Sequence, residues 1–537
     1  MTATLTAERP RAKGTPSALR SGALMAAGSL VSRATGFVRA AVVAAALGAG
    51  YVADGYAVGN SVPTIVYMLL LGGALNAVFV PELVKAAKEH EDGGVAYTDR
   101  LLTLCALALT VITAGAVLTS PLIVDTYTDY AGEQREMTVA FARACLPQIL
   151  FLGLFTLLGQ ILNARGRFGA MMWTPVLNNV VVAVFALFLV VSDGGTLSPG
   201  ETALLGWGTT AGIALQALAL VPSLRAAGFR WRPRLDWRGS GLGEPLRSAG
   251  WLVLLVLTNQ AAYWVTTLLA TSAGESVSGG GLAAYNNAYL LWTVPHGIIT
   301  VSLVTALLPR MSGAAADGDL AAVRRDVSYA LRTSSAAVVP AACALLALAV
   351  PLMTVVFRYG ATTGDDIRAM SWILMAFAPG LVALSGQHVC TRAFYALRDT
   401  RTPFLLNLVI AGLNAALSFA AHQYLPTRWA VVGMAAGYSL ALWAGWALTA
   451  YVLRRRLGGT PSGGGAGPAL VRLLAAAVPA AGYGFLVTDL TGPAGAVPAG
   501  LAGALTILTA FATLAHPLRL TELQTLLRSG TTRLHRR

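Results

Sequence analysis

The sequence has few charged residues for its length. Asp, Glu, Lys and Arg make up 12% of its 537 residues, about half the share found in ordinary soluble domains. Hydrophobic residues make up 56% and come in runs of about 20 or more, long enough to cross a bilayer core as helices. The alternating pattern of a lipid-facing β-barrel is missing. These features exclude a water-soluble fold and predict an all-α integral membrane protein.

Groups that carry covalent or metal chemistry are equally scarce. The four cysteines, Cys105, Cys145, Cys343 and Cys390, fall in or at the ends of apolar runs without metal-ligand spacing, so we interpret them as packing residues. The sequence has no nucleophile motif and no Gly-rich phosphate loop. We therefore expect no catalytic residues, no metal, no cofactor and no enzymatic activity. A membrane glycosyltransferase is disfavoured because no sizeable outer loop offers a carboxylate base.

The apolar runs predict about fourteen membrane helices. Their approximate ranges are 22–48, 58–84, 101–124, 137–163, 171–192, 202–224, 248–271, 281–308, 329–356, 369–391, 403–421, 429–452, 469–488 and 495–515. The first run is too long for a signal peptide and contains Arg33 and Arg39, so we interpret it as a membrane helix. An even number of helices places both termini on one side.

The distribution of basic residues tests this topology, because cytoplasmic loops hold an excess of Lys and Arg. Of the 38 basic residues, those assigned to the side opposite the termini are only Arg135, Arg143, Arg358, Arg368 and Arg428. We therefore expect a multi-pass protein of the cytoplasmic membrane with both termini in the cytoplasm. Its net charge of +14 is explained by loops facing anionic lipid headgroups, and we expect no nucleic-acid partner.

An internal repeat predicts two lobes. Residues 161–179 (ILNARGRFGAMMWTPVLNN) and 393–407 (AFYALRDTRTPFLLN) each have arginines in a tight turn before a proline and an asparagine that open the next helix. Helices 2 and 8 match likewise, with Pro63 and Pro81 against Pro295 and Pro309. We therefore predict pseudo-symmetric six-helix lobes over 1–240 and 241–457, joined through an interfacial segment at 225–247. Residues 458–537 would hold a flexible linker, helices 13 and 14 and a basic tail.

Charges inside the predicted spans are candidate functional residues, because they are costly to insert. Arg33 and Arg39 are six residues apart, about 9 Å of rise, on different parts of one helix surface. Arg33 is close enough to one end to snorkel, whereas Arg39 is near the membrane centre. A planar guanidinium suits a phosphate or pyrophosphate group. The alternative for Arg39 is an ion pair with Asp54, just past the end of that helix.

Amide side chains form a second candidate group. They are Asn60 in helix 2 and Asn259, Gln260, Asn286 and Asn287 in helices 7 and 8. They suit a wet cavity that binds sugar hydroxyls or peptide groups, and hydrogen bonds between helices are the alternative. We expect helices 1, 2, 7 and 8 to line a cleft between the lobes, with Arg39 and Asp54 facing it. His388 is interpreted as structural.

Several motifs in fixed order resemble those of a known family. They are SRATGFVR (32–39), VADGY with Asp54, FVPEL (79–83), ILNARGRF (161–168), LLPRMS (307–312), FRYG (357–360) and FYALRDTRTP (394–403). Together they resemble the MurJ (MviN) family of lipid II flippases, within the MATE-like multidrug/oligosaccharidyl-lipid/polysaccharide exporter superfamily. The resemblance implies fourteen helices, two lobes around a cationic cavity, and a C-terminal helix pair that forms a lipid-tail groove.

The resemblance also implies a function in peptidoglycan synthesis. The substrate would be lipid II, the undecaprenyl-pyrophosphate-linked disaccharide pentapeptide, moved to the outer leaflet of a bacterial cytoplasmic membrane by alternating access. Arg33, Arg39 and Asp54 match positions that are functional in the family. Membrane lipids and peptidoglycan synthases are the other partners it suggests.

The chain departs from the family pattern at charged positions of helices 2 and 8. Uncharged or small residues stand there instead: Tyr67, Met68, Gly72, Tyr289, Leu290 and Thr293. The second lobe is therefore expected to bring little charge to the cavity. Three alternatives stay open on the residues alone: a related MATE-like exporter, a flippase for another polyprenyl-linked glycan, and a non-transporting scaffold for envelope synthesis.

Overall fold

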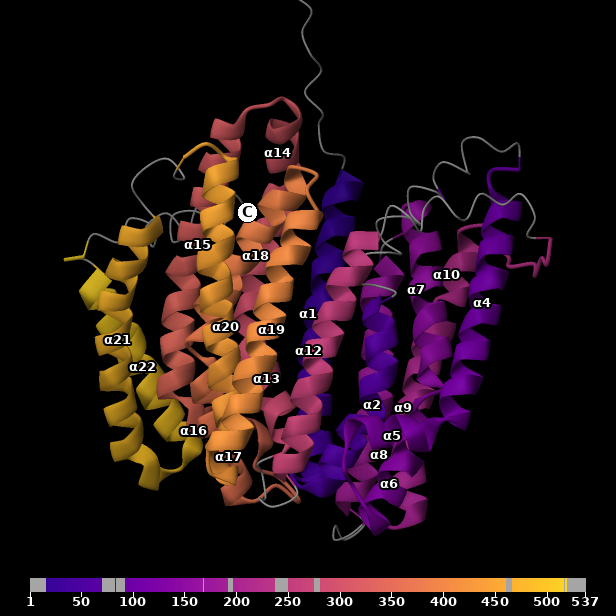
Figure 1. Cartoon of the computed structure of the whole chain (residues 1–537), viewed down its shortest axis with the longest axis horizontal. Coiled ribbons are helices and arrows are strands. Elements are labelled where there is room, and N and C mark those ends of the chain that lie inside the picture. Colours follow the sequence, from indigo (N-terminus) through magenta and orange to yellow (C-terminus); the bar gives the residue numbers. More distant parts are fainter. Residues whose placement is uncertain are drawn as a thin grey trace, which may run out of the picture.

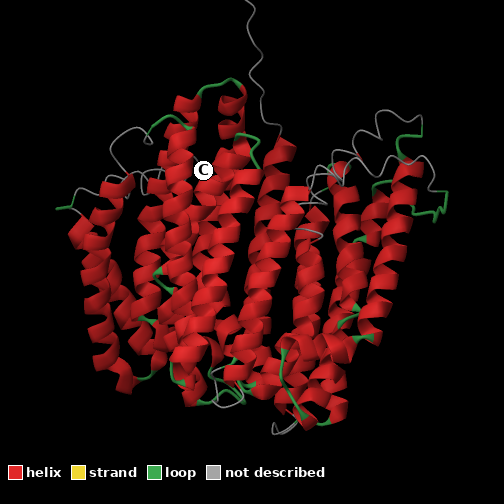
Figure 2. Ribbon diagram, viewed as in Figure 1, coloured by secondary structure: helices red, strands yellow, loops and turns green. Residues whose placement is uncertain are grey.

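The computed structural model describes residues 16–69, 83, 92–167, 169–191, 197–236, 250–274, 281–459, 466–515 and 517–518. Within these ranges every regular element is a helix (Figure 2). The first half contains α1 (Pro16–Leu47), α2 (Tyr51–Leu69), α4 (Val95–Leu118), α5 (Ser120–Tyr127), α6 (Gly132–Cys145), α7 (Gln148–Ala164), α8 (Gly169–Val191), α9 (Pro199–Leu218) and α10 (Val221–Ala226).

The second half continues with the same kind of element. It contains α12 (Gly250–Gly274), α13 (Leu282–Pro295), the π-helical turn η2 (His296–Thr300), α14 (Val301–Ala316), α15 (Leu320–Ala347), α16 (Ala349–Phe357), α17 (Gly364–Phe377), α18 (Gly380–Ala396), α19 (Arg401–Tyr424) and α20 (Thr427–Arg456). The chain then forms α21 (Ala466–Thr491), the short η3 (Gly492–Ala494) and α22 (Ala496–Ala515).

The described residues contain most of the membrane helices predicted from the sequence. The described residues contain 12 helices long and apolar enough to cross a membrane, or up to 13 if α17 and α18, bent by 46°, count as one span. Predicted helix 2 (58–84) includes residues 70–82 and 84, which lie outside the described residues. The all-α membrane fold is therefore confirmed, and the total of fourteen stays a prediction.

The same helix pairs pack together in the two halves of the chain. α1 packs on α8 as α12 packs on α19, and α8 packs on α9 as α19 packs on α20. The same holds for α2 on α6 and α13 on α17, and for α4 on α7 and α15 on α18. Figure 1 shows the resulting bundles side by side, with α21 and α22 packed outside the second on α15 and α16. This is the expected pseudo-symmetric architecture. The boundaries near 240 and 457 stay predictions, because 237–249 and 460–465 lie outside the described residues.

Prolines break corresponding helices in both lobes. α6 and α7 are separated at Leu146 and Pro147, and α17 and α18 at Ala378 and Pro379. Proline lacks the N–H that would continue the helical ladder, and its ring crowds the preceding turn. In the second lobe, α13 ends at Pro295 and gives way to η2. The repeat in sequence therefore recurs as a repeat in backbone geometry.

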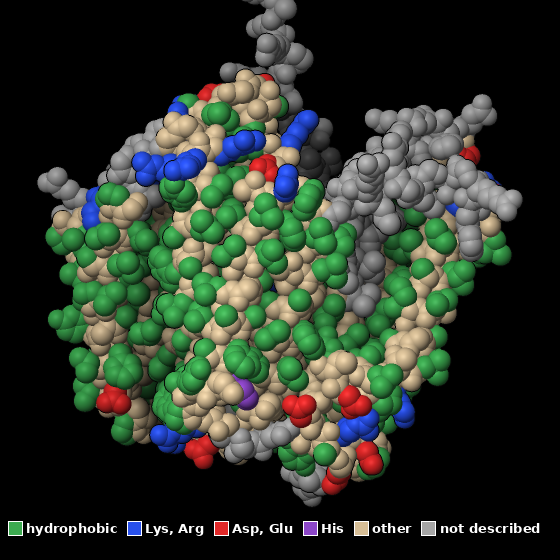
Figure 3. Space-filling model, in the orientation of Figure 1, with side chains coloured by type: hydrophobic (Ala, Val, Ile, Leu, Met, Phe, Trp, Pro, Cys, Tyr) green, Lys and Arg blue, Asp and Glu red, His purple; other side chains and the backbone are tan. Residues whose placement is uncertain are grey.

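The molecule has two polar ends and an apolar middle. We call the N-side the end at which α1 begins, at the top of Figure 1, and the far side the end at which α1 stops. In Figure 3 most visible Lys and Arg side chains gather at the N-side, whereas the far side shows both signs of charge, and hydrophobic side chains cover the band between them. This band is the surface that faces lipid.

The segment after α10 docks on the first lobe. The backbone N–H of Arg232 donates to Oδ1 of buried Asp99 over 3.1 Å. Arg100 and Asp236 form an ion pair of 2.5 Å, and this guanidinium holds the pKa of the Asp236 carboxyl below its usual range. The predicted interfacial segment therefore lies against α4 as far as residue 236, and its remainder, 237–249, is outside the described residues.

Candidate functional site

A cavity of about 310 Å³ lies between the two lobes. Its lining comes from α1 and the turn after it, α2, α12 and α13, which are the predicted helices 1, 2, 7 and 8. Arg39 is the one charged side chain among the described residues that line it. The other polar lining residues are Tyr56, Asn60, Ser61, Thr64, Gln260, Tyr263, Asn286 and Asn287. The described lining therefore combines one fixed cation with uncharged polar and apolar side chains.

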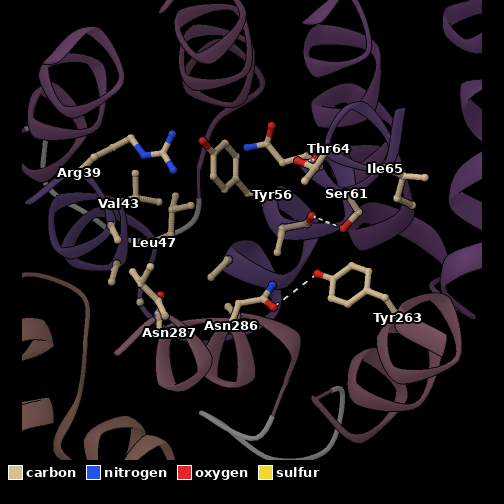
Figure 4. A pocket seen from close by; sticks show the side chains of 18 of the residues that line it. Arg39, Val43, Leu47, Tyr56, Ser61, Thr64, Ile65, Tyr263, Asn286 and Asn287 are labelled. Carbon is tan, nitrogen blue, oxygen red and sulfur yellow. Dashed lines mark hydrogen bonds between the residues drawn. The ribbon is translucent and has the colours of Figure 1, made fainter. Parts of the chain in front are cut away.

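Arg39 is eight residues before the end of α1, which is about 12 Å along the helix. Figure 4 shows its guanidinium pointing toward the hydroxyl of Tyr56, which is 2.9 Å from Oγ1 of Thr209 in the first lobe. The ion pair with Asp54 considered from sequence is not among the ion pairs of the described residues. The donors of Arg39 are therefore available to an anion in the cavity.

Some of the predicted amides form hydrogen bonds with other side chains. Gln148 donates to Oδ1 of Asn60 over 3.1 Å, and Asn407 donates to Oδ1 of Asn259 over 2.9 Å. The Tyr263 hydroxyl lies 3.4 Å from Oδ1 of Asn286 (Figure 4). Hydrogen bonds between helices therefore account for part of this polarity, but each of these amides keeps further capacity for a ligand.

Asn287 and Gln260 complete the predicted set of amides. Asn287 lies with Nδ2 3.8 Å from Sδ of Met370, a weak acceptor, and no hydrogen bond of Gln260 occurs in the described structure. Gln260 lines both this cavity and its neighbour. These two amides are therefore the least committed of the predicted group.

A second cavity of about 620 Å³ adjoins the first and reaches into the second lobe. The two share Thr64, Gln260, Tyr263 and Asn286 as walls. The second cavity is lined by α2, α12, α13, α18, α19 and α20, and Asn259 belongs to it rather than to the first. No Asp, Glu, Lys or Arg is among its described lining residues. As expected from sequence, the second lobe adds little fixed charge.

Sequence reasoning missed two polar groups of this second cavity. Oε1 of Gln387 on α18 and Oδ1 of Asn414 on α19 are buried and have no hydrogen-bond partner within the described residues. A buried amide oxygen without a partner is costly, so both suit contact with water or a polar ligand. In the sequence each is a single amide in an apolar run. Only the packing of the helices brings the two together, and the sequence does not record that packing.

Arg33 points toward the second lobe. α1 begins at Pro16, but its candidate membrane span begins at Ala27, six residues before Arg33. A β-carbon on Gly297 of η2 would lie 2.6 Å from Nη1 of Arg33, so the guanidinium reaches across to the second lobe. Snorkelling of Arg33 therefore stays a prediction. Arg33 does not line either cavity described above.

Asp54 closes the far side of the first cavity rather than lining it. Its buried carboxylate accepts the backbone N–H of Ala283 over 2.7 Å. Ala283 is in the first turn of α13, so a residue of the first lobe caps a helix of the second. A β-carbon on Gly274 or Gly281 would collide with this carboxylate. Capping by an anion satisfies an orphan donor and complements the helix dipole.

A segment of the second lobe also caps a helix of the first lobe. Ala361 donates its backbone N–H to the carbonyl of Ala45 over 2.7 Å, and Oγ1 of Thr362 donates to the carbonyl of Ala44 over 2.9 Å. Both acceptors are in the last turn of α1, where carbonyls lack partners within the helix. Gly360 before them has φ +57°, and a β-carbon there would collide with the Ala45 carbonyl.

We call this pair of exchanged caps, formed by Asp54 with Ala283 and by residues 361–362 with Ala44 and Ala45, the far-side clasp. Further hydrogen bonds between the lobes join Trp264 to the Thr126 carbonyl and Thr271 to the Tyr127 carbonyl. These acceptors end α5, at the same side of the molecule (Figure 1). The lobes are therefore joined by hydrogen bonds at the far side.

Metal chemistry finds no support in the described residues. They contain no group of three or more His, Cys, Asp or Glu side chains arranged to hold a metal ion. The four cysteines are free thiols, and Cys145 and Cys390 are buried. The arrangement of donors at Arg39 and the amides suits anions and polar groups.

Comparison with known proteins agrees with this geometry. The family model described as "Lipid II flippase MurJ" matches residues 43–499. The chain is 26% identical over 414 residues to the probable lipid II flippase MurJ of Vibrio cholerae serotype O1, covering 74% of this chain and 77% of that one. It is 27% identical over 385 residues to the lipid II flippase MurJ of Burkholderia cenocepacia, covering 70% and 72%.

Solved structures share the fold. The lipid II flippase MurJ in an inward closed conformation matches with a TM-score of 0.73 at 18% identity, over 92% of this chain and 99% of that one. An inward-facing multidrug resistance transporter of the MATE family matches with a TM-score of 0.57 at 13% identity, over 81% and 93%. Because the family model spans most of the sequence, the chain belongs to the lipid II flippase MurJ family.

Proposed function

We propose that this chain moves lipid II from the inner to the outer leaflet of the bacterial inner membrane by alternating access. The observation that carries the proposal is Arg39, a guanidinium without an ion-pair partner in the described structure, in a cavity between two lobes. A pyrophosphate that leaves water loses several kcal/mol of hydration per charge, and Arg39 offers charge and a donor fork to offset that loss. Family membership supports the same substrate.

The parts of the substrate match separate regions of the protein. The pyrophosphate would bind at Arg39, and the sugars and peptide would contact the amides of the two adjoining cavities. The polyprenyl tail would remain in lipid. An apolar groove of about 440 Å³ between α15, α20 and α21, lined by residues such as Leu346, Trp443 and Phe485, suits that tail.

The charges indicate how the chain is oriented in the membrane. The chain is a multi-pass protein of the bacterial inner membrane, and we place its basic N-side (Figure 3) in the cytoplasm by the positive-inside rule. Both termini would then be cytoplasmic. The far-side clasp faces the outside and is formed, so the structure represents a state that is closed outward. The transport cycle changes no covalent bond, and peptidoglycan synthases would consume the substrate after it arrives.

Complementation of a flippase-depleted cell tests the proposal. Arg39→Ala should fail to restore growth at normal membrane abundance, and lipid II should accumulate in the inner leaflet. Arg39→Lys should restore growth only partly, because an ammonium keeps the charge but loses the planar fork. Arg428→Ala, at an exposed arginine at the start of α20, is the matched control and should complement. Full complementation by Arg39→Ala would remove the cavity cation from the mechanism.

A further inference from the structure

Two histidines face each other inside the second lobe. His296 is in η2, directly after Pro295, and His388 is on α18. Their ring centroids are 5.2 Å apart with planes at 81°, and Nδ1 of His296 lies 3.0 Å from Oγ of Ser385. His296 is fourteen residues from both Leu282 and Arg310, about 21 Å along the helix in each direction. His296 therefore lies well inside the candidate span Leu282–Ala316, and His388 faces it from α18.

The pair borders the second-lobe cavity. His388 and its neighbour Gln387 both line that cavity, which shares walls with the one that holds Arg39. Both imidazoles are only partly buried. The segment that carries His296 is a π-helical turn, a rare distortion that is frequent at functional sites. A ligand headgroup in the second-lobe cavity would therefore have access to His388.

The charges that act on the pair are positive. Arg33 on α1 approaches Gly297, the residue after His296. Arg392 follows His388 by four residues, one turn along α18, and also acts on it. A proton added to either ring in the empty protein therefore adds a third positive charge to a group of two. We expect both rings to be neutral in that state.

No carboxylate near the pair compensates these charges in the described structure. α1, α13, α14, α18, α19 and α20, as described, contain no Asp or Glu. On α15, Asp326 is paired with Arg310 over 2.7 Å, and the acidic residues of α17 are in its first turn, toward the far side. The other titratable groups that line the cavity with His388, Tyr289 and Tyr438 among them, are phenols, which are uncharged at neutral pH.

We propose that His296 and His388 together bind one proton when an anionic, phosphate-bearing headgroup enters the cavity that holds Arg39 and the adjoining cavity that His388 lines. A pyrophosphate diester brings two negative charges, which reverse the sign of the local field and favour a cation on the pair. Histidine is the side chain suited to this change near neutral pH. The second lobe would thus supply, on demand, the positive charge that it lacks as fixed residues. This inference rests on the proposed function, because it requires a pyrophosphate-linked substrate.

The coupling has a thermodynamic consequence in both directions. If the anion favours the proton, the proton must favour the anion by the same factor. Headgroup affinity should therefore rise as pH falls, by up to about tenfold per pH unit for one proton. The proton taken up on binding would be released with the headgroup on the other side, so transport would respond to a proton gradient.

Calorimetry on the purified full chain in detergent tests this. The probe is a short-chain polyprenyl-pyrophosphoryl sugar, whose pyrophosphate diester keeps its charge across neutral pH. Binding heats in two buffers of different ionisation enthalpy give the number of protons taken up per ligand. The wild-type chain should take up a proton, whereas His296→Asn and His388→Asn should still bind with uptake near zero. His422→Asn, on α19 and outside the pair, is the matched control and should keep the uptake.

The outcomes separate the two proposals. Binding by the wild-type chain without proton uptake would overturn the histidine pair and leave the flippase proposal standing. Absence of binding by the wild-type chain would overturn both. Folded asparagine variants that keep full uptake would also overturn the assignment to these residues. Ser385→Ala, which keeps both imidazoles but removes the partner of Nδ1, is a second variant in case an asparagine variant fails to fold, and it should reduce the uptake at neutral pH.

Discussion

Removing the carboxylate of Asp54 should open the far side of the molecule. In the clasp this carboxylate accepts the Ala283 N–H over 2.7 Å and lies at the N-terminus of α13. Asp54→Ala leaves a buried N–H without its partner, which costs about 1–3 kcal/mol, and removes an anion from the positive end of a helix dipole, worth about 0.3–1 kcal/mol. The closed state should therefore lose about 2–3 kcal/mol, or roughly 30- to 150-fold in its ratio to the open state.

Asp54→Asn is the finer test. The amide oxygen can still accept the Ala283 N–H, so only the contribution of charge is lost, about 1 kcal/mol or roughly fivefold. Alanine should therefore shift the population much further than asparagine. If the two variants gave equal shifts, the hydrogen bond would contribute nothing measurable beyond the charge.

Distance measurement between spin labels follows this opening directly. Glu133 at the start of α6 and Asp365 at the start of α17 are exposed on the far side of different lobes, so labelled cysteines there report lobe separation in a cysteine-free background. Asp99→Asn is the matched control, because Asp99 is equally buried and accepts a backbone N–H, but within one lobe. An unchanged distance distribution in Asp54→Ala would refute the clasp as the element that holds the far side closed.

Three further substitutions test other contacts. Gly360→Ala should favour the far-side-open distances by about 1–2 kcal/mol or more, because the residue has φ +57° and its β-carbon would strike the Ala45 carbonyl. Gly297→Leu should reduce complementation by displacing the Arg33 guanidinium, whereas Gly313→Leu, whose β-carbon meets open space, should complement. Gly482→Phe should fill the groove of α15, α20 and α21 without a clash, so it should lower the transport rate while the thermal unfolding midpoint stays within about 2 °C.

Hydrophobicity and the internal repeat were sufficient to predict most of the architecture. Runs of apolar residues predicted the helices because a backbone in lipid must bond to itself, and the repeated motifs predicted the two lobes. The breaks at Pro147 and Pro379 fall inside spans that were predicted as continuous. The cost of a mid-membrane charge placed Arg39 in a cavity rather than against lipid. These arguments concern one helix and its solvent, which a sequence records directly.

The contacts between lobes were beyond the sequence for a physical reason. Asp54 bonds to a backbone N–H 229 residues away, and backbone groups carry no side-chain signature. Arg33 approaches Gly297 of the other lobe, and the sequence of α1 alone cannot show that contact. His296 was not singled out because a π-helical turn has no hydropathy pattern, so its approach to His388 appears only in three dimensions.

The chemistry of the clasp explains how such a contact can open during transport. Its bonds join helix ends to one carboxylate and one short segment, and groups of this kind are solvated by water when they separate, so opening costs far less than exposing an apolar core of equal area. Arg39 and the capped carbonyl of Ala45 are six residues apart on α1, about 9 Å along a rigid helix. A ligand that binds Arg39 more tightly in one lobe arrangement than in the other therefore acts on α1, the helix whose end the clasp holds. Such a difference need be only a few kcal/mol to move the balance between the two states.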